Sequence, residues 1–290
     1  MLYSDLYTTL RDILFELLLL YLIIFGNILL IKYGILQMIF IVFLIAIIIL
    51  LIIIIRDYRH LHRINPTTDI LFATSPQKKQ LDLMISDGFP IVIIDKIQDS
   101  VSLKDLSEKL PNLQITYNYK TKDTTNTIEM KDLHSHLDDF LLLKNESIVE
   151  NLKLDNIIQL ILYGFNRNYV YYPVTNIYSH IVSKDTRIPL RKNTFDTNII
   201  VAMNGSFRIF MVSPLYQQNM YEKDSATPID IWNPDMKKYP KYKSVKISSD
   251  IINEKEMVYI PPKWWYAIYA PDTTFMIQIE RDNILSQYIK

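Results

Sequence analysis

Residues 13–55 form an almost unbroken apolar run, and this run limits the fold more than any other feature of the sequence. Glu16 and Lys32 are its only charged residues. Its second half, residues 35–55, reads ILQMIFIVFLIAIIILLIIII. At ~1.5 Å per residue this half extends roughly 31 Å as a helix, which matches the thickness of a hydrocarbon core. The sequence therefore predicts a membrane-spanning helix at residues 35–55.

The first half of the run, residues 13–31, is nearly as long, although Gly26-Asn27 interrupts it. Only three residues separate the two halves, so we expect a transmembrane helix hairpin whose two ends face the same side. A cleaved signal peptide is the alternative. A basic leading segment is missing, however, and the apolar stretch is too long for a signal peptide.

Positive charge follows the run at once. The segment RDYRHLHR contains Arg56, Arg59 and Arg63, and basic residues next to a membrane span mark its cytoplasmic side. We therefore expect a lipid bilayer as a partner and a cytoplasmic location for the remaining chain. His60 and His62 lie in the same segment, and we interpret them as neighbours of lipid headgroups rather than metal ligands.

Turn-forming residues between positions 65 and 76 indicate a linker. The predicted organisation is an N-terminal tail (1–12), a membrane hairpin with spans near 13–31 and 35–55, a basic segment and linker (56–80) and a soluble domain (81–290).

Composition excludes several classes of function. The 290 residues include 31 basic and 31 acidic side chains, so no net charge attracts nucleic acid, and we expect no nucleic-acid partner. Because cysteine is absent, the chain has no disulfide framework, no thiolate nucleophile and no cysteine-based metal site. The abundance of Ile, Lys, Asn and Tyr is typical of an AT-rich genome, such as that of a large DNA virus or an intracellular microbe.

The first part of the soluble domain mixes strands and helices. FPIVIID (89–95) and NLQITYNY (112–119) have the patterns of strands, and SVSLKDLSEKL (100–110) predicts a helix with Ser102 as its N-cap. IEMKDLHSHLDDFLL (128–142) is expected to begin another helix.

That second helix would contain four side chains of types that bind metals, namely His134, His136, Asp138 and Asp139. On a helix, residues two apart point about 200° away from each other, so the two histidines do not reach one ion. We interpret the segment as a solvated polar face.

From Asn198 the pattern becomes entirely β. In NIIVAMNGSFRIFMV (198–212), Asn204-Gly205 lies between two apolar runs and predicts a two-residue hairpin turn. Several short strands follow, which favours a sandwich or a barrel. They are SVKISSD (244–250), EMVYIPP (256–262), WYAIYA (265–270) and FMIQIE (275–280).

A set of residues in this region occurs in a characteristic order: Pro189-Leu190, Asn198, Gly205, Pro214, Tyr239-Pro240, Ile260-Pro261-Pro262 and Trp264-Trp265. In this order they resemble the cupin-like JmjC group of iron(II)- and 2-oxoglutarate-dependent hydroxylases, over roughly residues 89–280. The resemblance implies an α+β fold in which a cupin-like domain, a JmjC-type double-stranded β-helix with flanking helices, follows the membrane hairpin.

In that group a Pro-Leu-His-x-Asp entry supplies two iron ligands, and the chain departs from it. Counting forward from Pro189-Leu190 places Arg191 and Asn193 at the two ligand positions, whereas counting back from Asn198 places Lys192 and Thr194 there. Neither choice yields a histidine or an aspartate. A protonated guanidinium or ammonium has no lone pair to give and repels a dication.

The other two functional positions are also changed. Tyr266 stands where the group has its third ligand, a histidine, and Phe207 stands where a lysine would bind 2-oxoglutarate. Non-haem iron(II) needs imidazoles and a carboxylate with open positions. The resemblance therefore implies a domain that kept the fold and lost the metal, with no cofactor.

Two uses of the pocket remain open beside simple packing. In the first, aromatic side chains and Asn198 line a cleft that holds a small anionic ligand or a protein, with a cation at its mouth. The aromatic candidates are Phe207, Tyr259, Trp264, Trp265, Tyr266 and Tyr269, and the candidate cations are Arg191, Lys192 and Arg208. A metal bound by His180 and Asp185 is the other.

Two functions follow. We favour a non-enzymatic, membrane-anchored binding or scaffold module. The alternative is an active hydroxylase with an unusual ligand set, which requires iron(II) and 2-oxoglutarate and requires at least two histidines to meet in the fold.

Overall fold

The computed structural model describes residues 21, 24, 34–62, 65, 68–94, 97, 100–119, 124–152, 154–165, 172, 174–223 and 226–283. It divides into two compact units, residues 1–56 and 57–290. The predicted tail (1–12) and all of the first predicted span (13–31) except Tyr21 and Ile24 lie outside the described residues.

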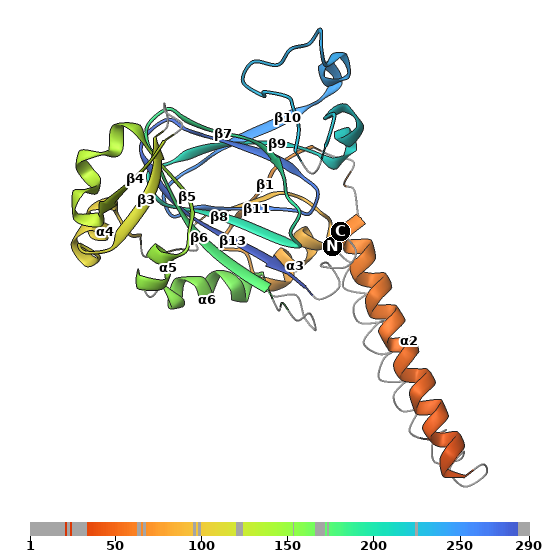
Figure 1. Cartoon of the computed structure of the whole chain (residues 1–290). Helices are drawn as coiled ribbons and strands as arrows, with labels where there is room; N and C mark the ends of the chain where they lie inside the picture. Colours follow the sequence, from red (N-terminus) through yellow and green to blue (C-terminus); the bar gives the residue numbers. More distant parts are fainter. Residues whose placement is uncertain are drawn as a thin grey trace. The chain divides into compact units, whose positions relative to one another are not determined.

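The first unit contains most of helix α2 (Ile35–His62) (Figure 1). Within it, the 20 residues from Gln37 to Arg56 have a mean hydropathy of 3.9, long and apolar enough to cross a membrane. It is the one such helix among the described residues, and a signal sequence passes the same test. The predicted span at 35–55 is thus a helix, which continues through Arg56 and Arg59 instead of ending at residue 55.

The second unit contains two β-sheets (Figure 1). The large sheet has nine strands; in spatial order they are β1 (Leu71–Thr74), β2 (Ile91–Ile94), β11 (Met257–Ile260), β8 (Thr197–Asn204), β13 (Thr274–Asp282), β6 (Val174–Val182), β5 (Phe140–Asn145), β3 (Gln114–Tyr119) and β4 (Thr125–Glu129). The small sheet has four: β10 (Ile247–Ile252), β9 (Phe207–Val212), β12 (Trp265–Ala270) and β7 (Thr186–Lys192).

Short helices accompany the sheets. The α-helices are α3 (Lys78–Ser86), α4 (Leu103–Lys109), α5 (Ser147–Leu152) and α6 (Asp155–Gly164), and the 3-10 helices are η1 (Met130–Ser135), η2 (Leu137–Asp139), η3 (Pro214–Asn219) and η4 (Pro240–Ser244). Helix α4 begins as predicted, because Ser102 Oγ accepts a hydrogen bond from the Asp105 amide at 3.1 Å and the Asp105 carboxylate accepts one from the Ser102 amide at 2.8 Å.

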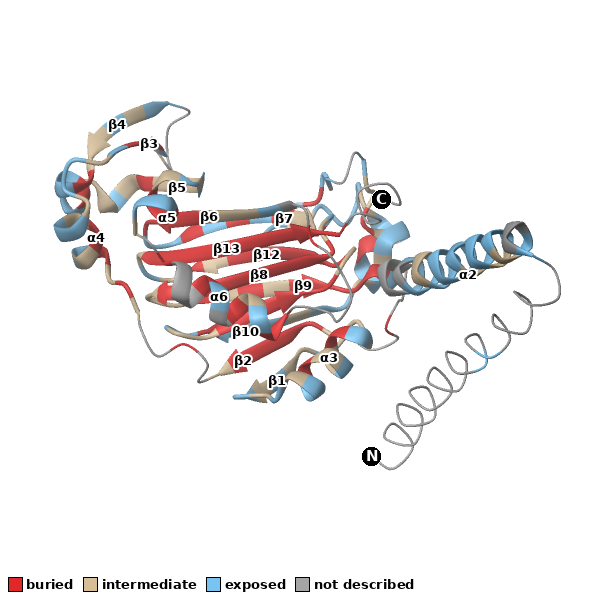
Figure 2. Cartoon of the chain, turned by 90° about the horizontal axis from the view of Figure 1, so that it is seen from below, coloured by how far each residue is buried: buried red, intermediate tan, exposed pale blue. Residues whose placement is uncertain are grey.

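Alternation along the strands divides the core into three layers. On β8, Ile199 and Val201 pack in the cluster shared with the helices, whereas Ile200 and Ala202 pack in the cluster between the two sheets. A third cluster lies on the other face of the small sheet and includes Trp265. Buried residues concentrate in central strands such as β8, β12 and β13 (Figure 2). The space between the sheets is the barrel interior.

The segment 128–142 was predicted as a helix, and that prediction is wrong. It contains the end of β4, the short 3-10 helices η1 and η2, and the start of β5. Leu133 and Phe140 are buried seven residues apart, which two turns of α-helix would also produce. Apolar spacing alone therefore does not separate the two structures.

The hairpin predicted at Asn204-Gly205 is also wrong. Gly205 has the expected positive φ of 77°, but β8 belongs to the large sheet and β9 to the small one, and they do not pair. The turn instead carries the chain from one sheet to the other, because each strand finds its partners among distant segments, β11 and β13 for β8 and β10 and β12 for β9.

Part of the predicted linker belongs to the folded unit. β1 pairs in parallel with β2 from Leu71 to Thr74, and the Asn65 side chain donates to the Asp87 carbonyl at 2.8 Å. The short strand carries a turn signal on each side, which made it resemble a linker.

Candidate functional site

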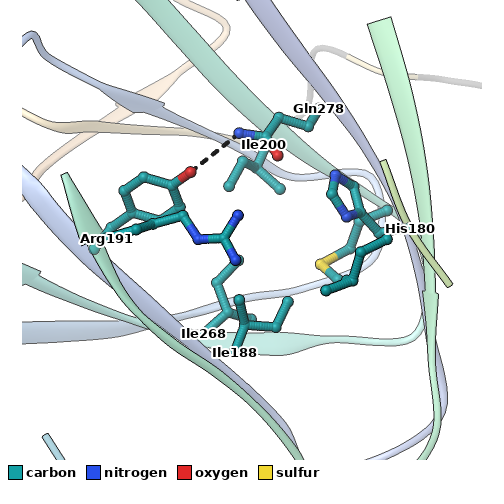
Figure 3. A pocket seen from close by; sticks show the side chains of 9 residues that line it. His180, Ile188, Arg191, Ile200, Ile268 and Gln278 are labelled. Carbon is teal, nitrogen blue, oxygen red and sulfur yellow. Dashed lines mark hydrogen bonds between the residues drawn. The ribbon is translucent and has the colours of Figure 1, made fainter. Parts of the chain in front are cut away.

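The barrel interior contains a small cavity at the point where the family pattern would place its metal (Figure 3). Its volume is about 10 Å³, room for about one water molecule. Six strands of the two sheets line it: Leu143 from β5, His180 from β6, Ile188 and Arg191 from β7, Ile200 from β8, Tyr266 and Ile268 from β12, and Met276 and Gln278 from β13. The interior is therefore packed rather than hollow.

Arg191 and Tyr266 are cross-strand partners on β7 and β12, so their side chains point to the same face of the small sheet. Arg191 is half-buried and Tyr266 is buried. The Arg191 guanidinium points into the cavity (Figure 3). It makes no hydrogen bond or ion pair with any residue in the described ranges. Burial raises the pKa of the Tyr266 phenol, so the phenol stays protonated at neutral pH.

Gln278 connects the polar groups of the interior. Its Nε2 lies 3.0 Å from Asn198 Oδ1, 3.2 Å from Tyr266 Oη and 3.0 Å from Glu280 Oε1. An amide nitrogen carries two protons, so these three contacts share two donors. The residues come from three strands, and the network ties β8 and β13 of the large sheet to β12 of the small one.

Glu280 is buried and pairs with Lys144 on β5, whose Nζ lies 3.0 and 3.1 Å from the two carboxylate oxygens. Burial raises the pKa of Glu280, although the Lys144 and Arg191 charges oppose that shift. Lys144 has a left-handed backbone (φ 54°), and its Nζ lies 4.8 Å from the centre of the Tyr178 ring. The ion pair thus connects the polar network to a position of β5 where the pairing with β6 is irregular.

His180 is buried in the cavity wall and held neutral. Burial first of all, and then the Arg191 and Lys144 charges, lower the pKa of His180 to about 3, with the Gln278 side chain acting against them. Its Nδ1 lies 3.4 Å from the Lys144 amide nitrogen, which donates to it. Its Nε2 makes no hydrogen bond with the described residues.

The structure distinguishes between the two ways of counting the positions at which the family has its first two iron ligands. Lys192 points away from the interior, where its Nζ lies 2.7 Å from Glu222 Oε1, and Thr194 is exposed. Arg191 is the one that faces Tyr266. The count that starts at Pro189-Leu190 therefore describes the interior, and the count back from Asn198 does not.

Asn193 serves as a clamp on the Pro-Pro-Lys-Trp-Trp turn. Its side-chain nitrogen donates to the carbonyls of Ile260 at 2.8 Å and Pro261 at 3.0 Å, and its backbone bonds with Lys263 and Trp264 at 2.8 Å each. The Asn193 oxygen accepts from the Phe195 amide. This residue is occupied in holding the turn that precedes β12.

The aromatic candidates do not gather in one cleft. Trp264 and Phe207 pack between the sheets, but Trp265 belongs to the outer cluster and Tyr259 packs toward the helices, with its ring 5.5 Å from that of Phe165. Tyr269 points outward and donates to Asp185 Oδ1 at 2.7 Å. Alternation along β11 and β12 sends neighbouring rings to opposite faces.

Of the three cations considered as an anion anchor, Arg191 alone lines the cavity. Arg208 is the cross-strand partner of Tyr269, so both side chains lie on the outward face of the small sheet. Phe207, the residue before Arg208, points the opposite way and is buried in the interior. Lys192 is engaged by Glu222.

Neither metal site considered from the sequence is assembled. Asp185 is exposed and bonded to Tyr269, whereas His180 is buried in the interior. His134 is exposed, and His136 Nδ1 lies 3.2 Å from the Tyr117 hydroxyl. Within the described ranges, no three His, Asp or Glu side chains come together to hold an ion. A guanidinium, an amide and a protonated phenol are also the wrong donors for iron(II), so these residues do not fit the metal of the family.

Sequence reasoning missed Lys144, Gln278 and Glu280. A signal for two of them was present, because Gln278 and Glu280 occupy alternate positions of the otherwise apolar segment FMIQIE in β13 and so had to face one side together. No local pattern identified Lys144, which reaches Glu280 across 136 residues of chain.

Comparison with known proteins agrees with this geometry. Residues 144–279 match the model of a family described as Cupin-like domain. Relatives with JmjC names match at low identity: Jumonji C domain-containing protein 5 of Drosophila melanogaster, 28% identical over 85 residues, and Lysine-specific demethylase 8 of Xenopus tropicalis, 26% identical over 85 residues. Residues 144–279 are a cupin-like domain related to JmjC proteins.

The matched region, residues 144–279, contains every residue that lines the cavity except Leu143. The matches cover 28% of this chain in both cases, and 21% and 19% of the two relatives. JmjC domain-containing protein C of Dictyostelium discoideum is 26% identical over 97 residues, which are 31% of this chain and 23% of that protein. The matched part thus spans about a fifth of each relative's length.

Proposed function

We propose that this chain is a membrane-anchored cupin-like domain that has lost catalysis and acts as a binding or scaffold module on the cytoplasmic face. One observation carries the proposal: Arg191 extends its guanidinium into the interior beside Tyr266, at the point where the JmjC resemblance requires an iron ligand. A fixed positive charge there opposes a dication.

The packing of the interior supports the same function. The cavity of about 10 Å³ has no space for a molecule the size of 2-oxoglutarate unless side chains move. Phe207, at the position of the cosubstrate lysine, is fully buried among the apolar side chains between the sheets and offers no charge to a carboxylate.

The membrane part of the proposal rests on α2. Its apolar stretch from Gln37 to Arg56 is long enough to cross a bilayer, and Arg56 and Arg59 are exposed at its C-terminal end. This arrangement of charge favours the cytoplasm for the residues that follow.

The experiment uses the full chain purified in a neutral detergent. The protein is loaded anaerobically with iron(II), bound metal is measured by elemental analysis, and 2-oxoglutarate is titrated by calorimetry. A JmjC relative with an intact ligand set, treated in parallel, is the control for loading. We expect far less than one iron per chain and no saturable 2-oxoglutarate binding. One iron per chain together with cosubstrate binding would contradict the proposal.

The alternative, an active hydroxylase with an unusual ligand set, has one observation in its favour. His180 presents a neutral imidazole to the cavity, and its Nε2 is unbonded among the described residues. It requires a second histidine nearby, and His136 is instead bonded to Tyr117. The iron-loading experiment decides between the two functions.

A further inference from the structure

The Arg191 guanidinium is a cation that forms no direct ion pair within the described part of the chain. It has five N–H donors, yet it forms no hydrogen bond or ion pair with the described residues, and it points into a cavity walled by Ile188, Ile200 and Ile268 (Figure 3). Unmet donors in a partly dry site cost free energy. A hydrogen-bond acceptor from outside the domain would therefore bind to this guanidinium favourably.

Among the residues that line the cavity, Arg191 is the one that carries a charge at neutral pH. The neighbouring carboxylates already have partners, because the Lys144 ammonium lies 3.0 Å from Glu280 and Asp282 accepts a hydrogen bond from the Asp196 amide. His180 adds no charge at neutral pH because burial lowers its pKa to about 3.

A second, independent observation points to the same ligand class. His180 is 5% exposed, lines the same cavity and has an Nε2 that is unbonded within the described part of the chain. Neutral imidazole carries its proton on one ring nitrogen. Since Nδ1 lies where it accepts from the Lys144 amide, the proton is on Nε2, which is then a donor. Arg191 and His180 therefore both offer N–H groups to the cavity.

The size of the cavity limits the ligand. With about 10 Å³ inside, it has room for about one oxygen atom of a ligand, so the rest of the ligand has to lie outside it, beside the half-buried Arg191. A carboxylate is planar and meets the guanidinium through two parallel hydrogen bonds. A phosphate dianion or a dicarboxylate brings a second negative charge, for which the residues lining the cavity offer no second cation.

We propose that Arg191 binds a single carboxylate group, one oxygen of which enters the cavity, where His180 is a second donor. This inference rests on the proposed function as a binding module and specifies its ligand. The carboxylate belongs either to a small monocarboxylate or to the C-terminus of a partner protein, because both present the same group.

The test titrates the full chain in neutral detergent with carbon-13 acetate and follows the NMR line width. We expect saturable binding that the variant Arg191→Met weakens by at least about tenfold, since a charge-assisted hydrogen bond is lost. Arg208→Met is the matched control: Arg208 lies on the outward face of the small sheet, and the variant should bind acetate as the wild type does. Arg191→Lys, which keeps the charge and loses the planar fork, should give intermediate affinity, and circular dichroism verifies that each variant is folded.

A short peptide with a free C-terminus and its amidated form distinguish the two sources. Tighter binding of the free peptide than of acetate, lost on amidation, identifies a protein-borne carboxylate; saturable binding of acetate alone identifies a small molecule. Chloride and phosphate serve as competitors. The proposal is overturned if acetate does not saturate, if Arg191→Met binds it as tightly as the wild type, or if chloride competes as well as acetate.

A negative result in the acetate titration can be told apart from a result that contradicts the proposed function. Absence of acetate binding in a chain that also binds no iron would leave an inactive module with a different ligand. Stoichiometric iron binding would overturn the proposed function whatever acetate does.

Discussion

At the scale of one residue, Asn193 stands at a ligand position of the family pattern and holds the turn before β12. Its side-chain nitrogen donates to the carbonyls of Ile260 and Pro261. We expect Asn193→Asp to lower the free energy of unfolding by about 3 to 5 kcal/mol, because it buries a charge against carbonyl oxygens. Denaturant unfolding monitored by circular dichroism measures the change.

Asn219→Asp is the control for that substitution. Asn219 also donates to a carbonyl, that of Lys241, at 3.0 Å, but the bond is exposed. Its loss should cost about 1 kcal/mol or less. Equal costs at the two positions would show that Asn193 does not clamp the turn.

His180 predicts a dependence of stability on pH. Its folded pKa of about 3 lies below the ordinary value of 6.5, so the unfolded chain takes up a proton first as the pH falls. The stability that neutral His180 contributes is complete above pH 6.5 and is lost toward pH 3, and at pH 5 about 2 kcal/mol has gone. Glu280, which has a raised pKa, acts in the opposite direction near its own titration.

The variant His180→Gln isolates this contribution, since Glu280, Lys144 and Arg191 remain. The difference in unfolding free energy between wild type and variant should fall by about 2 kcal/mol from pH 8 to pH 5. Parallel pH profiles for wild type and His180→Gln would contradict a buried neutral imidazole.

The substitutions at positions 191 and 266 could be predicted from the sequence, because the neighbouring Pro-Leu and Trp-Trp pairs mark these positions in the family pattern. The residues that contact Arg191 and Tyr266 could not be predicted from it. Whether Arg191 or Lys192 faces inward depends on the register of β7 against β12, which has an irregularity between Tyr266 and Ile268. A register is set by contacts between distant segments, and a local pattern does not determine it.

At the scale of elements, the turn between β8 and β9 depends on one glycine. A Cβ atom on Gly205 would lie 2.8 Å from the Thr273 carbonyl oxygen, and φ is 77°. We expect Gly205→Ala to destabilise the domain by about 2 to 4 kcal/mol, from the left-handed backbone and the clash together. Thermal and denaturant unfolding measure the loss.

Two further variants separate the causes. Asn tolerates the left-handed region, so Gly205→Asn keeps only the clash and should cost less than Gly205→Ala. Ser206→Ala should be close to neutral, since the Ser206 carbonyl, and not its side chain, accepts the bond from Thr274. A neutral Gly205→Ala would remove the close approach as an explanation for this glycine.

Elements with strong local signals were predicted well. The Ser102 cap and helix α4 are confirmed, as are β2, β3 and the four strands from Ile247 to Asp282. Asn204-Gly205 gave a correct turn and an incorrect pairing, because a tight turn also serves a chain that passes between two sheets. Local chemistry determines the turn, and the partners of the strands are decided far along the chain.

At the scale of the whole molecule, the folded β-sheet unit includes β1 and so starts before the end of the predicted linker. β1 covers the edge of β2, and Ser248 Oγ donates to the Thr68 carbonyl. A chain that begins at residue 63 keeps both contacts and the Asn65 bond to Asp87. A chain that begins at residue 80 loses them and leaves β2 as an open edge, which invites aggregation.

We therefore expect residues 63–290 to leave the membrane fraction and elute from gel filtration as a folded species, while the full chain sediments with membranes because it keeps α2. Residues 80–290 should aggregate or unfold at lower denaturant concentration. If residues 80–290 were as stable as 63–290, β1 would be dispensable and the predicted linker would be correct as a functional boundary. If residues 63–290 still sedimented with membranes, α2 would not be what holds the protein there.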